Sequence, residues 1–260
     1  MATLVFFHAH PDDEAISTGG TMALAARSGH RVVLVVATKG EEGLVPEGFL
    51  DSRETLSSRR VAETMISAEI LGVKRVEFLG YRDSGMMGWA QNDNPECFWK
   101  ANVDSAADRL KTILAEECAD VVTVYDDHGG YGHPDHIQVH RVGHLAAELA
   151  ETPRVYEATM RRESIKAVSR SVWTGDNLSD DVIDHLGTPE SDLSAAIDVR
   201  EILDCKRAAM AAHASQITKE SWILRLPEDL FSAAFGTEWY RRTRPTFTGR
   251  IPSDRDTSLF

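Results

Sequence analysis

Short apolar runs alternate with longer amphipathic segments through the first 160 residues, and this pattern constrains the fold more than any other feature. Residues 31–37 are almost continuously apolar, which is typical of a strand buried on both faces of a sheet. In the segment 53–71, Val61, Met65 and Ala68 form one stripe that is expected to face the core. Alternation of this kind predicts a mostly parallel sheet covered by helices on both faces. Strands are expected at 4–7, 31–37, 76–79, 121–125 and 154–160, and helices at 16–29, 53–71, 103–114 and 134–150.

The expected architecture is therefore an α/β, Rossmann-like fold. The length of 260 residues fits one domain that spans residues 1–260. Periodicity weakens in the C-terminal part, residues 161–260. There we expect a polar, turn-like stretch at 171–195, a helix at 198–213, and a final irregular tail that contains two prolines.

Composition excludes several classes of protein. The 28 basic and 41 acidic side chains give a net charge of −13, and an acidic chain repels phosphate backbones, so nucleic acid is not an expected partner. No apolar run reaches the length of about 18 residues that a membrane span needs. The three cysteines lack CxxC spacing, which argues against both a disulfide framework and a thiolate zinc site. The first residues lack the features of a secretory signal, so we expect a cytoplasmic protein; the sequence does not indicate its oligomeric state.

Two clusters of histidine and aspartate follow predicted strands. One occupies residues 8–14 and the other residues 126–136. Because the carboxyl ends of parallel strands meet at one edge of a sheet, the clusters are expected to converge there. Imidazole and carboxylate suit a borderline cation such as Zn²⁺, and three such ligands leave a position for water. The sequence therefore predicts a catalytic metal site at this edge.

Other enzyme classes fit the same residues less well. A dinucleotide site needs glycines after the first strand, but Asp12, Asp13 and Glu14 stand there and would repel phosphate. Neither a GK[ST] motif nor a GxSxG elbow is present. As a glycosidase pair, the adjacent residues Asp12 and Asp13 would rarely face each other across the gap of about 5 Å or more that this chemistry requires.

The segments 10–14 (HPDDE) and 132–136 (GHPDH) resemble the PIG-L/LmbE family of metal-dependent N-deacetylases. The similarity covers roughly residues 4–160, with a weaker echo at 206–216, and the mycothiol-pathway branch is the most similar. The resemblance implies a metal-dependent amide hydrolase that removes an acetyl group from an N-acetylglucosamine-type sugar conjugate. The alternatives are an amidase of mycothiol S-conjugates, a deacetylase of a sugar-bearing natural product, or, more remotely, a non-catalytic protein that binds sugar or metal.

The resemblance also implies roles for individual residues. His10, Asp13 and His136 match the three metal ligands of the family, with Zn²⁺ as the expected ion and Fe²⁺ as the alternative. Asp12 matches the general base that deprotonates the attacking water. His133 matches the residue that stabilises the oxyanion and protonates the leaving amine.

Four further residues complete the implied site. Asp135 is expected to orient and charge the imidazole of His133. Tyr131 is expected to donate to the developing oxyanion. Arg60 and Asp83 are similar to residues that hold sugar hydroxyls.

Each of these roles has a structural alternative. Asp12 can cap the following helix, and Asp135 can stabilise a first helical turn through the helix dipole. Arg60 can lie on the solvated face of its helix. Asp83 can form a turn, and Tyr131 can pack within its loop.

Several residues near the motifs are less constrained. His8 is expected beside the metal site as a core residue or as a support behind a ligand, and His128 as a loop residue. For His213, Trp89 and Trp99, two interpretations remain: contact with the substrate, or packing against the core.

Overall fold

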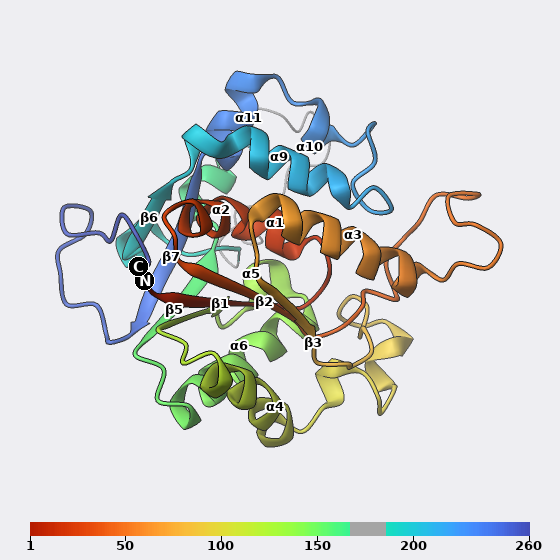
Figure 1. Ribbon diagram of the computed structural model, residues 1–260, viewed down its shortest axis with the longest axis horizontal. Coiled ribbons are helices and arrows are strands. Elements are labelled where there is room, and N and C mark those ends of the chain that lie inside the picture. The colour runs from red at the N-terminus through yellow and green to blue at the C-terminus, as the bar shows by residue number, and fades with distance from the viewer. Residues whose placement is uncertain (167–185) are drawn as a thin grey trace.

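One seven-stranded sheet forms the centre of the computed structural model, which describes residues 1–166 and 186–260. The sheet lies between two layers of helices (Figure 1). Its strand order is β3-β2-β1-β4-β5-β7-β6. The strands are β1 (Thr3–His8), β2 (Arg31–Val36), β3 (Arg75–Phe78), β4 (Val121–Tyr125), β5 (Arg154–Thr159), β6 (Ala195–Asp198) and β7 (Thr237–Arg244).

The first five strands run parallel to one another, and β1 lies between β2 and β4. The predicted fold class, a mostly parallel α/β sheet, is confirmed. The chain leaves β1 toward β2 and β3 on one side and later returns to β4 and β5 on the other. The strand order therefore reverses between β1 and β4, which is where open α/β sheets bind their ligands.

The C-terminal part adds two strands that the sequence did not reveal. β7 pairs antiparallel with β5, and β6 pairs antiparallel with β7. The expectation of an irregular tail was therefore wrong for β7. Its basic side chains have distant partners, since Arg241 donates to Glu157 and Arg242 to Asp256, so no local apolar pattern marks the strand. Most of the stretch expected to be turn-like, residues 171–185, lies outside the described residues.

Helices cover both faces of the sheet, as expected. In Figure 1 the layer of α1, α2, α3 and α9 lies on one side of the sheet, and α4 and α6 lie on the other. The segment predicted as one helix at 16–29 is divided at Thr18, and the helix expected at 198–213 begins as a 3₁₀ turn. The described helices are α1 (Asp13–Ser17), α2 (Gly19–Arg27), α3 (Leu56–Leu71), α4 (Val103–Glu116), α5 (Gly129–Gly132), α6 (Pro134–Leu149), α9 (Leu203–Ala212), α10 (Trp222–Arg225) and α11 (Glu228–Phe235), with 3₁₀ turns at Ala90–Asp93, Phe98–Lys100, Glu190–Asp192 and Arg200–Ile202.

Two apolar cores fill the spaces between sheet and helices. Along β1, Leu4 and Phe6 belong to the core under α2 and α9, whereas Val5 and Phe7 belong to the core under α4 and α6. This alternation follows from the period of two in a strand. Among the described residues, no helix is long and apolar enough to cross a membrane.

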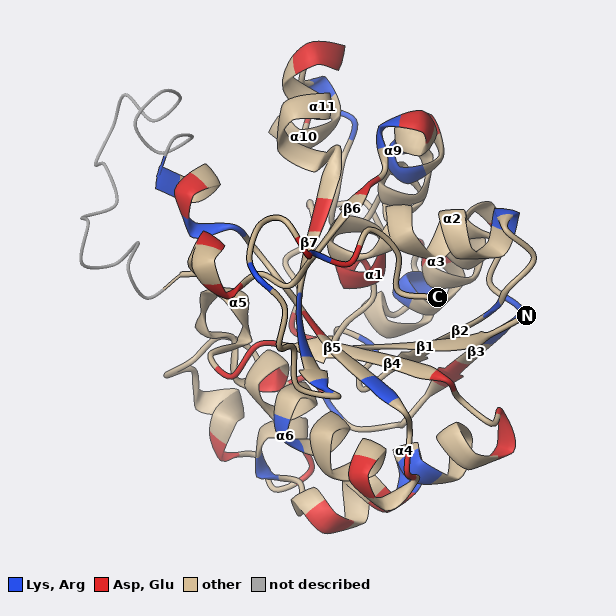
Figure 2. Cartoon of the chain, turned by 90° about the vertical axis from the view of Figure 1, so that its left-hand side faces the viewer, with Lys and Arg blue, Asp and Glu red and all other residues tan. Residues whose placement is uncertain are grey.

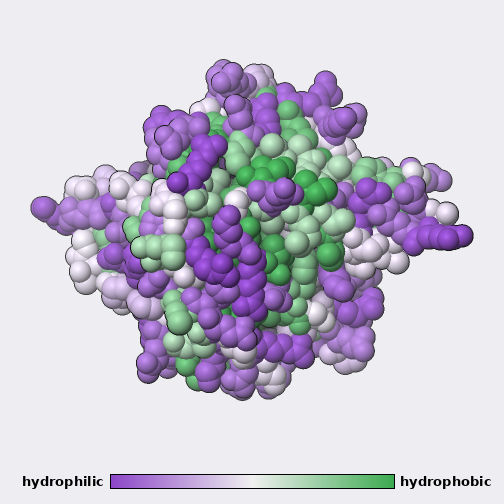
Figure 3. Space-filling model, viewed as in Figure 1, coloured by the Kyte–Doolittle hydropathy of each residue, from purple (hydrophilic) through white to green (hydrophobic). Residues whose placement is uncertain are grey.

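The buried face of α3 is largely polar: Ala68 is buried as predicted, but Met65 of the same predicted stripe is exposed. Met65 and Ile66 are 52% and 53% exposed, whereas the buried positions include Arg60, Glu63 and Ser67. Apolar side chains accordingly gather near the middle of the face shown in Figure 3, where α3 lies in Figure 1. The polar face is turned inward because it supplies hydrogen bonds to the residues that follow β1, as the site geometry shows.

Candidate active site

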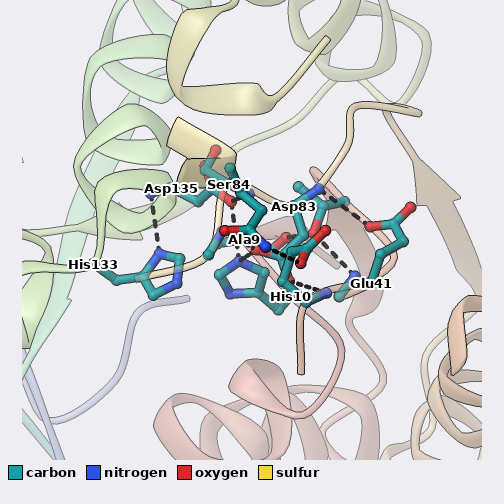
Figure 4. A network of polar contacts seen from close by, with 12 residues as sticks. Ala9, His10, Glu41, Asp83, Ser84, His133 and Asp135 are labelled. Carbon is teal, nitrogen blue, oxygen red and sulfur yellow. Dashed lines mark hydrogen bonds and ion pairs between the residues drawn. The ribbon is translucent and has the colours of Figure 1, made fainter. Parts of the chain in front are cut away.

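The two predicted motifs meet at the carboxyl ends of β1 and β4. Residues 8–14 leave β1 and enter α1, while residues 126–136 leave β4 and enter α6. The loop that follows β3 reaches the same place. Figure 4 shows His10, Asp83, Ser84, His133 and Asp135 gathered there. The parallel order of the sheet therefore places side chains that are more than 100 residues apart side by side.

The three residues expected to bind a metal converge on one carboxylate oxygen. Oδ2 of Asp13 lies 3.2 Å from Nδ1 of His10 and 3.3 Å from Nε2 of His136. The backbone N–H of His10 donates to the same oxygen at 2.9 Å, which fixes the Asp13 side chain. Both imidazoles are buried. Each of the two imidazoles thus places one nitrogen beside the Asp13 carboxylate.

The donor set fits a divalent cation. Nε2 of His136 is buried and has no hydrogen-bond partner, although it faces Asp13. Burial alone would lower the pKa of His10, but the carboxylates of Asp83, Asp13 and Asp135 raise that pKa well above its usual value. The negative charges of these carboxylates favour a cation beside the imidazole. The combination of imidazole nitrogen and carboxylate oxygen suits Zn²⁺ or Fe²⁺.

Asp12 occupies a strained backbone position at the start of α1. Its φ is 88° and its ψ is −32°, a region that non-glycine residues rarely adopt outside functional sites. Although Asp12 stands at the N-cap, its side chain makes no capping hydrogen bond. Burial raises the pKa of Asp12 to about 6, against the lowering effect of Arg60. The carboxylate is therefore held ready to accept a proton near neutral pH.

Arg60 lies against Asp12 and the neighbouring backbone. Its guanidinium donates to Oδ2 of Asp12 at 3.1 Å, to the Gly40 carbonyl at 2.8 Å, and to the carbonyl of Pro11. Gly40 has a φ of +66°, and a Cβ there would lie 2.2 Å from the guanidinium. The alternative of a solvated helix face is excluded by the burial of Arg60. The expected contact of Arg60 with sugar hydroxyls stays a prediction.

His133 caps α6, and its neighbour Asp135 does not orient its ring as expected. Nδ1 of His133 accepts the backbone N–H of Asp135 at 3.1 Å, so the hydrogen of the neutral ring is on Nε2. Burial, with His10 and His136, lowers the pKa of His133 to about 3. The Asp135 carboxylate instead accepts from Nε2 of His10 at 3.1 Å and from Ser84. The physical reason is that Asp135 lies in the first turn of α6 and points toward β1.

The loop after β3 contributes Asp83 and Ser84. Oδ1 of Asp83 lies 3.4 Å from Nε2 of His10 and accepts the backbone N–H of Gly85. Ser84 donates to the Asp135 carboxylate through both its backbone N–H, at 2.9 Å, and its hydroxyl. Sequence reasoning missed Ser84, whose only signal is its place beside Asp83. The contact of Asp83 with a sugar, like that of Arg60, stays a prediction.

Two tyrosines flank His136. The ring of Tyr125, the last residue of β4, stacks on the His136 imidazole with centroids 4.2 Å apart and planes within 8°. Its hydroxyl bonds to Nδ1 of His8 at 2.8 Å, so His8 supports the site from behind, as expected. Tyr131 is 48% exposed, and its ring lies 5.1 Å from that of His136 and 6.1 Å from that of His133. Tyr131 is therefore a partly exposed residue beside both imidazoles, and its expected donation to the oxyanion stays a prediction.

The remaining candidates are structural or peripheral. His213 is completely buried and bonds to Glu14, so it packs beneath the site and does not line a pocket. The guanidinium of Arg141 on α6 lies 4.8 Å from the centroid of the Trp99 ring, so this tryptophan packs against α6. Trp89 is 41% exposed. His128 bonds to Asp127 in the turn after β4 and is not among the converging ligands.

Two imidazoles and a carboxylate, beside a base with a raised pKa at the reversal point of the sheet, define a candidate metal-dependent hydrolase. The chain belongs to the PIG-L family, described as GlcNAc-PI de-N-acetylase, whose match covers residues 5–147. It is 41% identical to the 1D-myo-inositol 2-acetamido-2-deoxy-alpha-D-glucopyranoside deacetylase of Acidothermus cellulolyticus, over 95% of this chain and 90% of the relative. The predicted family is thereby confirmed, and the chain is a deacetylase, a hydrolase of amide bonds.

Solved structures share the fold at lower identity. The N,N'-diacetylchitobiose deacetylase of Pyrococcus horikoshii matches with a TM-score of 0.55 at 24% identity, covering 92% of this chain and 83% of the other. GalB, the 4-carboxy-2-hydroxymuconate hydratase of Pseudomonas putida KT2440, matches with a TM-score of 0.60 at 20% identity, covering 96% and 100%. Because a hydratase has the same fold, the fold alone does not determine the reaction.

Proposed function

We propose that this protein removes the acetyl group from an N-acetylglucosaminyl inositol in a zinc-dependent reaction, with Fe²⁺ as the alternative ion. The convergence of His10 and His136 on Asp13 carries the proposal. The substrate class rests on the relative that is 41% identical along nearly the whole chain. The products would be acetate and a free amino sugar.

His10, Asp13 and His136 would hold the ion. When bound, it would polarise the scissile carbonyl and make a nucleophile of water at neutral pH. The Asp135 and Asp83 carboxylates, on the far side of the His10 ring, fix its orientation. Support of this kind usually decides both the affinity for the ion and the basicity of the ligand.

Asp12 accepts a proton from the attacking water in this proposal. Arg60 holds the Asp12 carboxylate in place by donating a hydrogen bond to its Oδ2. His133 offers Nε2–H to the carbonyl oxygen as negative charge develops there, and Tyr131 offers its hydroxyl. The resemblance gave the proton of the leaving amine to His133. We assign it instead to Asp12, because Nδ1 of His133 accepts a backbone N–H and a neutral imidazole is a weak acid.

Substrate preference is the test of this proposal. The zinc-loaded protein is assayed for released amine with N-acetylglucosaminyl inositol, N,N'-diacetylchitobiose and a mycothiol S-conjugate, and the Asp12→Ala variant serves as the blank. We expect the highest kcat/KM with the inositol conjugate. A higher value with the S-conjugate would favour the amidase alternative, and turnover by the blank would reject Asp12 as the base.

A further inference from the structure

A second group of imidazoles and a carboxylate lies outside the catalytic cluster. His140 and His144 stand on α6, and Glu157 stands on β5. Nε2 of His144 lies 2.9 Å from Oε1 of Glu157, and Nδ1 of His140 lies 3.4 Å from the same oxygen. The three residues offer ligand atoms that all lie within 4.8 Å of one another. The spacing of four residues places both histidines on one helix face, as in helical zinc motifs.

The group is open to solvent on its histidine side and closed on its carboxylate side. The side chains of His140 and His144 are 22% and 31% exposed, whereas Glu157 is 1% exposed. An ion can therefore reach the imidazoles directly from water. The Glu157 carboxylate, in contrast, is buried on strand β5. Binding an ion would therefore need little rearrangement of the site.

Partners behind the ligands resemble those of known metal sites. Nδ1 of His140 donates to the carbonyl of Tyr125 at 3.0 Å, which orients the ring and leaves Nε2 as the nitrogen that can bind an ion. Arg241 of β7 donates through Nε to Oε2 of Glu157, which leaves Oε1 facing the imidazoles. Metal-binding histidines and carboxylates are usually held by such contacts.

Local charge favours a divalent cation. Glu157 carries a negative charge. The negative charges of Glu157, Asp127 and Asp126 all raise the pKa of Arg241. In Figure 2, α6 lies beside β5, the strand that carries Glu157. Without an ion, His144 and Glu157 form a hydrogen bond with each other. The competing explanation of the cluster is an ion-pair network that binds no metal.

We propose that His140, His144 and Glu157 form a second divalent-metal site, which takes a borderline ion such as Zn²⁺ and is separate from the catalytic one. Binding replaces the hydrogen bond between His144 and Glu157 by bonds from both residues to the ion and requires both imidazoles to be neutral. The ion would join α6 to β5. Because it binds only the folded chain, it would stabilise the protein without taking part in turnover.

Equilibrium dialysis against Zn²⁺ tests the site. We expect the wild type to bind one zinc ion more than His144→Asn does at low zinc concentration. In the variant, the affinity for this additional ion should be weaker by about tenfold or more. His128→Asn, a change at another partly exposed histidine near Asp127, is the control and should bind as the wild type does. His136→Ala should lose the catalytic ion and keep the outer one. Equal binding by the wild type and His144→Asn would overturn the proposal.

A second measurement does not depend on any variant. Crystals of the wild-type protein grown with Zn²⁺ should show an anomalous scattering peak among His140, His144 and Glu157. Absence of this peak, with a peak present at Asp13, would overturn the proposal while leaving the proposed function intact. Deacetylation by His144→Asn should stay within about twofold of the wild type, and a larger loss would overturn the separation of the two sites.

Discussion

Nη2 of Arg60 lies 3.1 Å from Oδ2 of Asp12, and this pair joins the polar face of α3 to the first motif. Burial raises the pKa of Asp12, whereas the guanidinium of Arg60 lowers it. The balance of the two effects leaves the pKa at about 6. Arg60 therefore lowers the pH above which the base is available.

Replacing Arg60 should move the acidic limb of the pH profile. Since Asp12 must be deprotonated to act as a base, kcat/KM of the wild type should fall as the pH drops through about 6. In Arg60→Gln the lowering influence is lost, so the limb should move to higher pH. Arg59→Gln, whose side chain pairs with Glu54, is the matched control and should leave the limb unchanged. An unmoved limb in Arg60→Gln would show that another group controls it.

Asp12→Asn should stabilise the metal-free protein at alkaline pH. A carboxyl group whose pKa is raised in the folded state costs stability above that pKa, and this cost disappears as the pH falls toward its unfolded pKa of 3.8. At pH 8 we expect a gain of roughly 1–3 kcal/mol, which shrinks toward pH 4. Urea unfolding at both pH values measures this difference. A variant less stable than the wild type at pH 8 would contradict the raised pKa.

Ser84→Ala should weaken metal binding. It removes the hydroxyl that holds the Asp135 carboxylate against His10, so the ligand ring loses part of its support. Loss of such a contact typically reduces metal affinity about 10–100-fold. Competition with a chromophoric chelator gives the affinity, and Ser57→Ala on the exposed start of α3 is the control. Equal affinity in Ser84→Ala and the wild type would remove Asp135 from the account of the site.

His213→Ala should destabilise the fold. Nε2 of His213 lies 2.6 Å from Oε1 of Glu14, and both side chains are fully buried. Removing the imidazole leaves a buried carboxylate without its charged partner, which typically costs about 3–5 kcal/mol. Chemical unfolding measures the loss, and His128→Ala, at the surface, should change little. A loss below about 1 kcal/mol would mean that Ser67 and the Asp12 backbone satisfy Glu14 without His213.

The fold and the meeting of the two motifs could be predicted because their signals are local. The parallel strands β1, β2 and β4 are short apolar runs, and His10 and Asp13 stand within four residues of each other. His136 follows β4 in a similar turn, and the parallel order of the sheet brings the two turns together. No knowledge of distant contacts was needed for this part.

The supporting residues could not be predicted, because their roles depend on partners far away in the chain. Ser84 and Tyr125 look like an ordinary loop serine and strand tyrosine until Asp135 and His136 are placed against them. The buried face of α3 was predicted only in part for the same reason, since Ala68 is buried and Met65 is not. Its polar face is buried because distant partners satisfy it: Ser67 donates to Glu14, and Ser215 donates to Glu63.

Release of acetate from N-acetylglucosaminyl inositol tests the central claim most directly. It should be measured with zinc-loaded protein, with chelator-treated protein, after zinc is restored, and with zinc-loaded Asp12→Asn. We predict that chelation abolishes the release and zinc restores it, and that Asp12→Asn lowers kcat by roughly 10²–10⁴-fold. Release that survives thorough chelation, or that Asp12→Asn supports at the wild-type rate, would contradict the account.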